Sequence, residues 1–367
     1  MRRVAITGLA AVTTAGFGID PLMKALQRGE PLGAVEEVRG PRRRILRVRV
    51  ARAAEFDPGP FLAPGALRRM APESRLLTTT CVMAMRDAGA DRPPISPGRT
   101  GTFTGSGFGC LRSTEEYLGG IFRDGMAAAS PQLFAESLAS APAGHAAIAI
   151  DARGMSVAFQ GGDASMILAL SAGWRAIRSG RIDRAVCGSF ELMSPTLLSV
   201  LARLSARSSP SRPPFFGEGA AAIVLEDLDA ARSAGARIHA ELRGLGLSGS
   251  TGAGPRDWSH DEDAWADAHA RALRSAAGEE DGIGVAFQHA PSSPAAARAE
   301  GRALDRLEDR HGAFERRRVD HVVGALAGAG GIAAAAAAMT AFGSKGLVLV
   351  SAGAWGGATA AAVMSGP

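Results

Sequence analysis

Short strand-like runs alternate with helix-patterned segments along most of the chain, and this alternation restricts the possible folds more than any other feature. The strand-like runs span residues 4–6, 101–104, 185–187 and 220–225, and helical patterns cover 20–27 and 74–88. Helices that alternate with buried strands pack on the faces of a sheet. The pattern therefore predicts an α/β layered fold, and 367 residues, 46% of them apolar, suffice to bury its core.

The order of elements in the second part of the chain loosely echoes the first. We expect a strand and turn at 238–249, a helix at 261–277, a strand at 284–287, a helix at 331–341 and a strand at 347–350. No residue-level repeat accompanies this echo. The sequence therefore predicts two similar halves, residues 1–230 and 231–367.

The positive charge does not indicate a nucleic-acid partner. The net charge of +5 comes almost entirely from arginine, because Lys24 and Lys345 are the only lysines. The arginines are scattered, and the longest run, residues 42–44, lies beside Gly40 and Pro41 without interleaved aromatic residues. Nucleic-acid-binding surfaces gather their basic residues on one face or helix. We therefore expect no nucleic-acid partner.

Cysteine usage points to a reducing compartment. Cys81, Cys110 and Cys187 are far apart, and no CxxC spacing occurs. This pattern predicts neither a disulfide framework nor a zinc or other metal site, and it fits the cytoplasm.

Two segments superficially resemble membrane signals. Residues 322–343 carry no charge, but they are mainly glycine and alanine, which is typical of a buried, closely packed helix. The opening MRRVAITGLAAVTTAG begins like a signal peptide, yet Gly8 interrupts its apolar core, and the run favours a strand that enters a turn. We expect no association with a membrane.

Residues 154–180, GMSVAFQGGDASMILALSAGWRAIRSG, place an aspartate where a glycine-marked turn leads into a helix. The apolar stripe of that helix consists of Ile167, Leu170, Trp174 and Ile177, and Gly180 is a natural stop. Asp163 therefore lies at the N-terminus of the helix. An aspartate there ordinarily caps the helix by accepting free backbone N–H groups.

The chain as a whole resembles the β-ketoacyl synthase family of the thiolase fold. The resemblance rests on RRVAITGLAAVTTAG, GTFTGSGFGC, SAPAGHAAIAIDARGMS, GEGAAAIVLEDLDAARSAGARIHAEL, QHAPSSP, GALAGAGGIAAA and SAGAWGGATAAAVM, which follow the family's order across essentially the whole chain. No single string would identify a family, and no GK[ST] phosphate loop follows any of them. The resemblance implies a thiolase-like α/β fold, with two similar halves stacked as five α-β-α-β-α layers.

In this family a cysteine at a strand-to-helix elbow takes the acyl chain as a thioester. It lies nine residues after the glycine of a Gly-Pro-Ser motif and seventeen before the glycine that closes the helix. Counted from Gly154 and from Gly180, both distances end at Asp163. None of the three cysteines occupies that position.

Two family histidines support decarboxylation, and only the first is matched here. His289 corresponds to the histidine of the His-Gly-Thr-Ser-Thr-Pro motif, whereas the histidine of the Gly-His-Leu-x-Gly-Ala motif is replaced by Ala325. The family's lysine a few residues earlier aligns with Asp320, and Trp355 stands in the degraded Gly-Phe-Gly-Gly-Thr-Asn loop. A carboxylate at the elbow cannot exchange an acyl group as a thiolate does, and one imidazole cannot provide a pair of donors. The resemblance therefore implies a condensation site without activity, with no cofactor.

This pattern resembles the chain-length factor of type II polyketide synthases, a silent subunit that pairs with an active ketosynthase and meets acyl carrier protein. The usual factor carries glutamine at the nucleophile position, and the nearest glutamine here, Gln160, lies three residues too early. Aligning Gln160 there would need an insertion of three residues in a helix that we expect to be continuous. The difference leaves open a divergent branch, such as the highly reducing systems that make polyenes.

By the same resemblance, the helix after GSGFGC lines the tunnel and the subunit interface. Leu111, Thr114, Tyr117 and Leu118 recur at helical spacing, and Tyr117 is the only tyrosine in the chain. Each could equally be ordinary interface core. Trp355 is a further candidate for the interface.

Two other functions stay open. The first is a decarboxylating ketosynthase-like subunit that primes synthesis, which Ala325 disfavours because that reaction needs both histidines. The second is a homodimeric scaffold that only binds acyl carrier protein. Expression of the chain alone and with its ketosynthase would separate the second from a heterodimer subunit.

Overall fold

The structure is a computed structural model of the 367-residue chain. It describes residues 1–39, 45–89, 95–208, 214–250, 252, 260–276, 282–288, 294–325, 328, 330–354 and 356–367, with the backbone alone for 205–208. His289, Trp355 and the arginines at 42–44 lie outside these residues.

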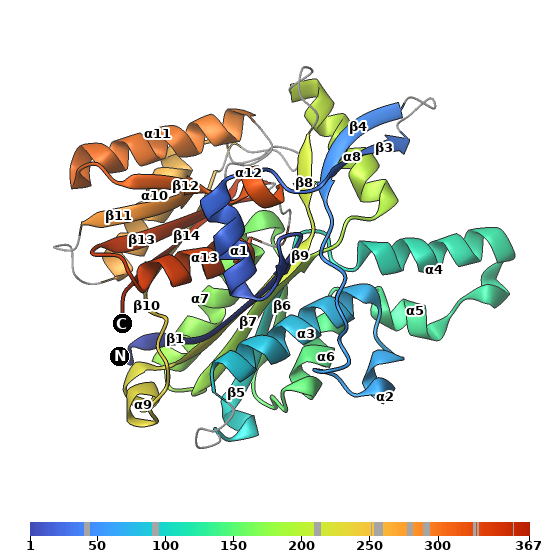
Figure 1. Cartoon of the computed structure of the whole chain (residues 1–367), viewed down its shortest axis with the longest axis horizontal. Helices are drawn as coiled ribbons and strands as arrows, with labels where there is room; N and C mark the ends of the chain where they lie inside the picture. Colours follow the sequence, from blue (N-terminus) through green and yellow to red (C-terminus); the bar gives the residue numbers. More distant parts are fainter. Residues whose placement is uncertain are drawn as a thin grey trace.

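Within the described residues, one sheet of eleven strands runs through the molecule (Figure 1). Its order is β12 (Glu315–Arg318), β11 (Ile283–Gln288), β13 (Leu347–Gly353), β14 (Ala358–Ser365), β10 (Ala240–Gly249), β1 (Val4–Thr13), β9 (Gly219–Asp227), β7 (Arg184–Glu191), β5 (Thr100–Ser106) and β6 (Ser156–Gln160), with β2 (Gly16–Phe17) paired to β1. The strands β12 and β6 form the two edges.

The sheet consists of two halves with the same topology. The order β1-β9-β7-β5-β6 in one half corresponds to β10-β14-β13-β11-β12 in the other. In each half the first two pairings are antiparallel and the last two are parallel. Antiparallel pairing of β1 with β10, through Ala5 and Glu241, joins the halves. The echo that the sequence suggests is therefore a duplication of topology, while the boundary at residue 230 stays a prediction.

Helices form three layers around the two halves of the sheet. The helices α3 (Pro72–Asp87) and α6 (Ala141–Ala149) pack on the first half, and α10 (Glu262–Ser275) with α11 (Pro294–His311) covers the second. Between the halves lie α7 (Ser165–Arg178) and α13 (Gly331–Ala341), because α7 contacts β5, β7 and β14, and α13 contacts β13 and β9. The molecule is thus a stack of α, β, α, β and α layers.

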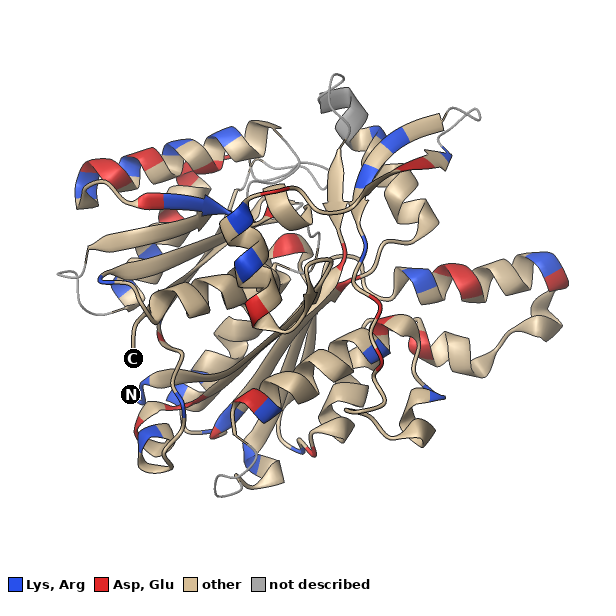
Figure 2. Ribbon diagram, viewed as in Figure 1, with Lys and Arg blue, Asp and Glu red and all other residues tan. Residues whose placement is uncertain are grey.

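The middle layer depends on small residues. The helix α13 carries no charged residue (Figure 2), and its run of alanines from Ala334 to Ala338 is fully buried between the two halves. A side chain at Gly331 would overlap Ser189 Oγ, so glycine permits the helix to approach β7. The prediction of a buried, closely packed helix in this segment is confirmed. Among the described residues, no helix is long and apolar enough to cross a membrane.

Smaller elements surround this stack. A three-stranded sheet of β3 (Ala34–Arg39), β4 (Ile45–Ala51) and β8 (Phe215–Gly217) packs against α8 (Pro195–Ser208). The remaining elements are α1 (Ile19–Arg28), α2 (Pro64–Leu67), η2 (Pro97–Arg99), α4 (Leu111–Asp124), η3 (Met126–Ala128), α5 (Pro131–Glu136), η4 (Gly162–Ala164), α9 (Leu228–Ser233) and α12 (Asp320–Val323). Residues 111–136, which we call the arm, contain α4, η3 and α5 and project from the body (Figure 1).

Candidate functional site

The turn between β6 and α7, residues 161–164, is the elbow turn, and it holds Asp163. Gly162 adopts φ of +57°, a left-handed conformation that lets the chain reverse sharply after the strand. Asp163 follows within the short helix η4, and only 4% of its surface is exposed. The position at a strand-to-helix junction, which the sequence predicts, is confirmed.

The capping role of Asp163 needs correction. The α-helix begins at Ser165, and Ala164 occupies its N-cap position, so Asp163 lies one residue before the cap. The physical reason is the additional 3₁₀ turn between strand and helix, which moves the start of α7 along the chain. The apolar stripe of α7 is buried as predicted, and Gly180 has φ of +71°.

Gln160 is not an alternative tip of the elbow in this geometry. It is the last residue of the edge strand β6 and is exposed, three residues before Asp163. The segment between Gln160 and Asp163 is therefore a strand end and a turn, so the expectation of a continuous helix there is wrong.

The Ser165 hydroxyl group ties the elbow turn to the neighbouring strand. Its Oγ accepts the N–H of Gly161 at 2.9 Å and lies 2.7 Å from the carbonyl oxygen of Ser106 at the end of β5. A Cβ at Gly105 would lie 2.6 Å from the Cβ of Ser165. The elbow is thus fixed against β5 by both a hydrogen bond and close packing.

Glycines of the second half close over the elbow. A Cβ at Gly330 would lie 2.5 Å from the carbonyl oxygen of Asp163, and the N–H of Gly331 donates to Ser189 Oγ at 3.2 Å. A Cβ at Gly328 would overlap the backbone nitrogen of Gly107. The two halves of the chain therefore meet at the elbow with no room for side chains at these positions.

Ala325 lies in an apolar environment. Its backbone pairs with β8, because its N–H donates to Phe215 O at 3.0 Å and its carbonyl accepts from Gly217 at 2.9 Å. Its methyl group packs, as do Phe108 and Leu111, against an apolar cluster between α8 and the small sheet. Asp320, aligned with the family's lysine, pairs instead with Arg318 at 2.7 Å.

Sequence reasoning missed Glu191, a fully buried carboxyl group at the end of β7. Its Oε2 atom accepts the N–H groups of Gly107 at 2.9 Å and Phe108 at 3.2 Å. Burial raises the pKa of Glu191 well above its ordinary value, and the nearby carboxylates of Asp163 and Glu73 raise it further. A glutamate inside the otherwise apolar run CGSFELM was the signal in the sequence.

None of the three cysteines lies in the elbow turn, and none has a lowered pKa. Burial raises the pKa of the Cys81 thiol to about 12, and burial raises the pKa of Cys187 as well. The pKa of Cys110 is raised by burial and by Glu73, Glu136 and Glu191. All three are therefore protonated thiols at neutral pH and poor nucleophiles.

The predicted tunnel residues lie together on the arm. Leu111, Thr114, Tyr117 and Leu118 belong to α4, as their helical spacing predicts. The Thr114 hydroxyl donates to Cys110 O at 2.9 Å, and the Tyr117 ring lies 5.7 Å from that of Phe134 on α5. Leu118 is 42% exposed. Whether these side chains line a tunnel stays a prediction.

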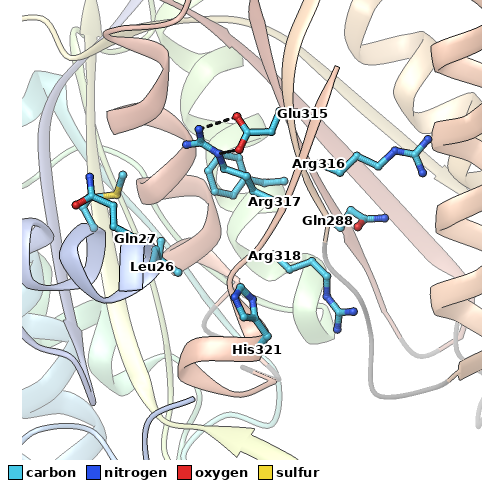
Figure 3. A pocket seen from close by; sticks show the side chains of 10 residues that line it. Leu26, Gln27, Gln288, Glu315, Arg316, Arg317, Arg318 and His321 are labelled. Carbon is cyan, nitrogen blue, oxygen red and sulfur yellow. Dashed lines mark hydrogen bonds and ion pairs between the residues drawn. The ribbon is translucent and has the colours of Figure 1, made fainter. Parts of the chain in front are cut away.

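A cavity of about 660 Å³ lies elsewhere, between α1 and the edge strand β12 (Figure 3). Its apolar wall contains Met23, Leu26 and Phe287. Its three arginines are matched by carboxylates: Arg316 by Asp305 and Glu308, Arg317 by Glu315, and Arg318 by Asp320. The cavity therefore has little unbalanced charge with which to select a ligand.

The duplicated topology, the five layers and the elbow at the meeting of the halves define the thiolase-like fold of ketosynthases. A model of the N-terminal domain of β-ketoacyl synthases matches residues 1–231. The chain belongs to the β-ketoacyl synthase family.

Relatives and solved structures agree with this assignment. The chain is 27% identical over 266 residues to the tetracenomycin polyketide synthase ketoacyl synthase alpha subunit of Streptomyces glaucescens, covering 66% of this chain and 62% of that protein. Thus the chain spans less than two thirds of that relative's length. The ishigamide ketosynthase/chain length factor superposes with a TM-score of 0.86 and 21% identity over 100% of this chain and 99% of that one.

A second solved structure, AntDE:AntF, is a type II polyketide synthase acyl-carrier protein in complex with its ketosynthase bound to the hexaketide. It matches with a TM-score of 0.81 and 18% identity over 100% of both chains. Both structural matches confirm the fold.

Proposed function

We propose that the chain is a ketosynthase-like subunit without condensing activity of its own, which pairs with an active ketosynthase as the chain-length factor of a type II polyketide synthase. The observation that carries the proposal is Asp163 in the elbow turn, at the position where the family's nucleophile is expected. A carboxylate there lacks the nucleophilicity of a thiolate. Its charge also repels a malonyl carboxylate in a buried site.

Ala325 supports the same proposal independently. A methyl group offers no hydrogen-bond donor, and the described side chains of the cluster against which it packs are apolar. Stabilising the enolate that decarboxylation forms requires positioned donors. Loss of the second imidazole therefore argues against a decarboxylating priming subunit.

Two exposed features fit a partner subunit. Among the described residues, the edge strand β6 pairs only with β5, so its other edge is free to extend a sheet. On the adjacent arm, large apolar side chains are exposed: Leu118 by 42%, Phe122 by 83%, Met126 by 75% and Phe134 by 53%. Exposed apolar groups gathered on a projecting element favour a protein interface.

In this proposal the arm contributes to the wall of the partner's acyl tunnel. Leu111, Thr114, Tyr117 and Leu118 set the length of the growing chain. The second partner is the acyl carrier protein that delivers the chain. The departure from glutamine at the elbow leaves open a divergent branch, such as the highly reducing systems that make polyenes.

The test combines assembly and chemistry. The purified chain is mixed with malonyl carrier protein, and with an active ketosynthase from the same biosynthetic system. We expect no acyl adduct on the chain by mass spectrometry, no acetyl product, and a heterodimer in size-exclusion chromatography with light scattering. Acetyl carrier protein formed by the chain alone would support the priming subunit. A stable homodimer that binds carrier protein but ignores the ketosynthase would support the scaffold.

A further inference from the structure

Glu191 is a buried polar group for which the proposed function has no use. Its Oε2 atom accepts two backbone N–H groups, from Gly107 and Phe108. Its Oε1 atom is also buried and has no hydrogen-bond partner among the described residues. Buried polar groups in native proteins are nearly always satisfied, so this oxygen needs an explanation.

The titratable groups around Glu191 are acidic. Asp163 faces it from the elbow turn, Glu73 from α3, and the Cys110 thiol from the start of α4. No arginine or lysine side chain among the described residues forms an ion pair with it. An ionised Glu191 would therefore be a buried charge with one oxygen unsatisfied and two carboxylates nearby, which costs far more than a buried neutral carboxyl group.

Glu218 is a second buried glutamate in this protein, and among the described residues it has a cationic partner that Glu191 lacks. It is 4% exposed and also accepts two backbone N–H groups, from Met193 at 2.9 Å and Ala53 at 3.1 Å. However, the Arg52 guanidinium donates to it at 2.7 Å. The two glutamates share a main-chain pattern and differ in the presence of a cation.

We propose that Glu191 carries a proton in the folded protein and, as a neutral carboxyl group, positions residues 107–111 against the elbow turn. The proton lies on Oε1, because Oε2 already accepts two N–H groups. Those N–H groups belong to the turn that leads from β5 into α4, so the carboxyl group fixes where the arm begins. The inference concerns this chain alone and does not depend on the proposed function.

The loop from the second half depends on this contact. A Cβ at Gly328 would lie 2.5 Å from Glu191 Oε2. Gly328 therefore packs directly on the carboxyl group while it accepts from Gly107. A charged, hydrated Glu191 would need space that this loop occupies.

The sign of the pH effect follows from the raised pKa. The unfolded chain releases the proton of Glu191 above its ordinary pKa of 4.5, whereas the folded chain retains it. The contribution of Glu191 to stability is therefore complete below that value and is lost as pH rises through the folded-state pKa. Glutamine has the same shape and no charge, so Glu191→Gln removes this dependence.

The experiment is thermal unfolding of the full chain and of Glu191→Gln from pH 5 to pH 8. Relative to the variant, the wild-type melting temperature should fall by about 2 °C for each pH unit until the folded-state pKa is passed. Asp163→Asn removes a neighbouring charge that raises the pKa of Glu191. In this variant the melting temperature should therefore stop falling at a lower pH. Glu218→Gln is the matched control and should lower the melting temperature by a similar amount at every pH, because it removes the ion pair between Glu218 and Arg52 and leaves Arg52 paired with Glu36 alone.

Infrared spectroscopy of the wild-type protein at pH 7.5 gives a second measurement. A protonated carboxyl band should be present there, should persist in Glu218→Gln, and should be absent from Glu191→Gln. A constant melting-temperature difference between wild type and Glu191→Gln from pH 5 to 8 would overturn the proposal. If Glu191→Gln does not fold, the absence of a protonated carboxyl band from the wild-type protein would also overturn the proposal.

Discussion

The elbow turn and the arm both adjoin β5. They differ in burial, because the elbow is enclosed whereas the arm exposes apolar side chains. At the elbow, Asp163 and Glu191 are buried carboxyl groups, and Gly328 and Gly330 pack closely against this region. On the arm, apolar side chains such as Phe122 and Met126 are exposed. In the proposed function, the elbow is a ketosynthase site without its reactive groups, and the arm is the surface that a partner subunit covers.

The two regions also differ in the space available for a side chain at their glycine positions. Every glycine that closes on the elbow touches backbone or buried side chains, as at Gly328 and Gly330. On the arm, Gly120 has nothing within 4 Å of the position that a Cβ would take. Close packing therefore distinguishes the elbow from the arm, although glycines elsewhere in the sheet, such as Gly244 and Gly246, are packed as closely.

The largest predicted effect tests this contrast in packing. Gly328→Ala should destabilise the chain by about 3 kcal/mol, because the new methyl group would overlap the backbone of Gly107. Gly120→Ala, in the middle of the exposed helix α4, should instead stabilise it by about 0.5–1 kcal/mol through higher helix propensity. Chemical denaturation measures both. Equal effects of the two substitutions would show that the elbow is not closely packed.

The second prediction concerns the exposed side of the arm. Phe122→Glu should weaken binding to the partner ketosynthase by about 30-fold, or about 2 kcal/mol, because it places a charge in an apolar interface. The stability of the chain alone should change by no more than about 0.5 kcal/mol, since Phe122 is 83% exposed.

Phe342 offers a matched control for this experiment. It is 59% exposed at the end of α13, outside the arm. Phe342→Glu should leave the affinity for the ketosynthase unchanged in isothermal titration calorimetry. Equal losses in both variants would remove the arm as the docking surface.

The sequence could predict the layered part of the fold because buried strands and helices have regular apolar patterns. The segment 331–341 is a helix with those bounds, and the strand at 347–350 lies within β13. The turn expected at Gly8 is wrong, because residues 4–6 only begin β1, which continues through Gly8 to Thr13 with a register shift in its pairing with β9. The small sheet was missed because β3, AVEEVR, is exposed and rich in charge. A hydrophobic pattern cannot reveal a strand that buries little.

The candidate site could be predicted only in part, for a different reason. Counting along the chain reached Asp163 because the strand, turn and helix are contiguous there. Glu191 acquires its environment from α3, the elbow turn and residues 107–108, which are distant in sequence. Its lack of a cation is a property of the folded neighbours, so no local pattern could distinguish it from Glu218.

A third prediction concerns the length of the product. In the assembled complex, Tyr117→Ala should lengthen the polyketide, because it removes a ring that packs against Phe134 and would close the tunnel end. Thr114→Ala and Leu118→Ala should have smaller effects, since they remove less volume. Mass spectrometry of the released products measures the change. Unchanged lengths in all three variants would argue that the arm is only an interface.

The smallest predicted effect is a pH dependence of the arm, opposite in sign to that of the elbow. Glu136 on α5 accepts Ala71 N–H at 2.8 Å and the Ser74 hydroxyl at 2.7 Å, and it lies 2.6 Å from His145 Nε2. Burial alone would raise the pKa of Glu136, but the hydrogen bonds from His145, Ala71 and Ser74 prevail and lower it below its ordinary 4.5. The carboxylate therefore ties the arm to α3 while it is ionised.

A lowered pKa gives stability that is complete above the ordinary value and is lost as pH falls through the folded-state pKa. Protection against hydrogen exchange in residues 111–136, corrected for the slower intrinsic exchange at low pH, should therefore decrease below about pH 4.5, before that of the central helices. Glu136→Gln should remove this dependence, whereas Glu116→Gln, on the exposed side of the same arm, should keep it. If the elbow and the arm lost protection together as the pH was lowered, the two regions would unfold as one cooperative unit. Glu136 and Glu191 would then not give the two regions opposite pH dependences of stability.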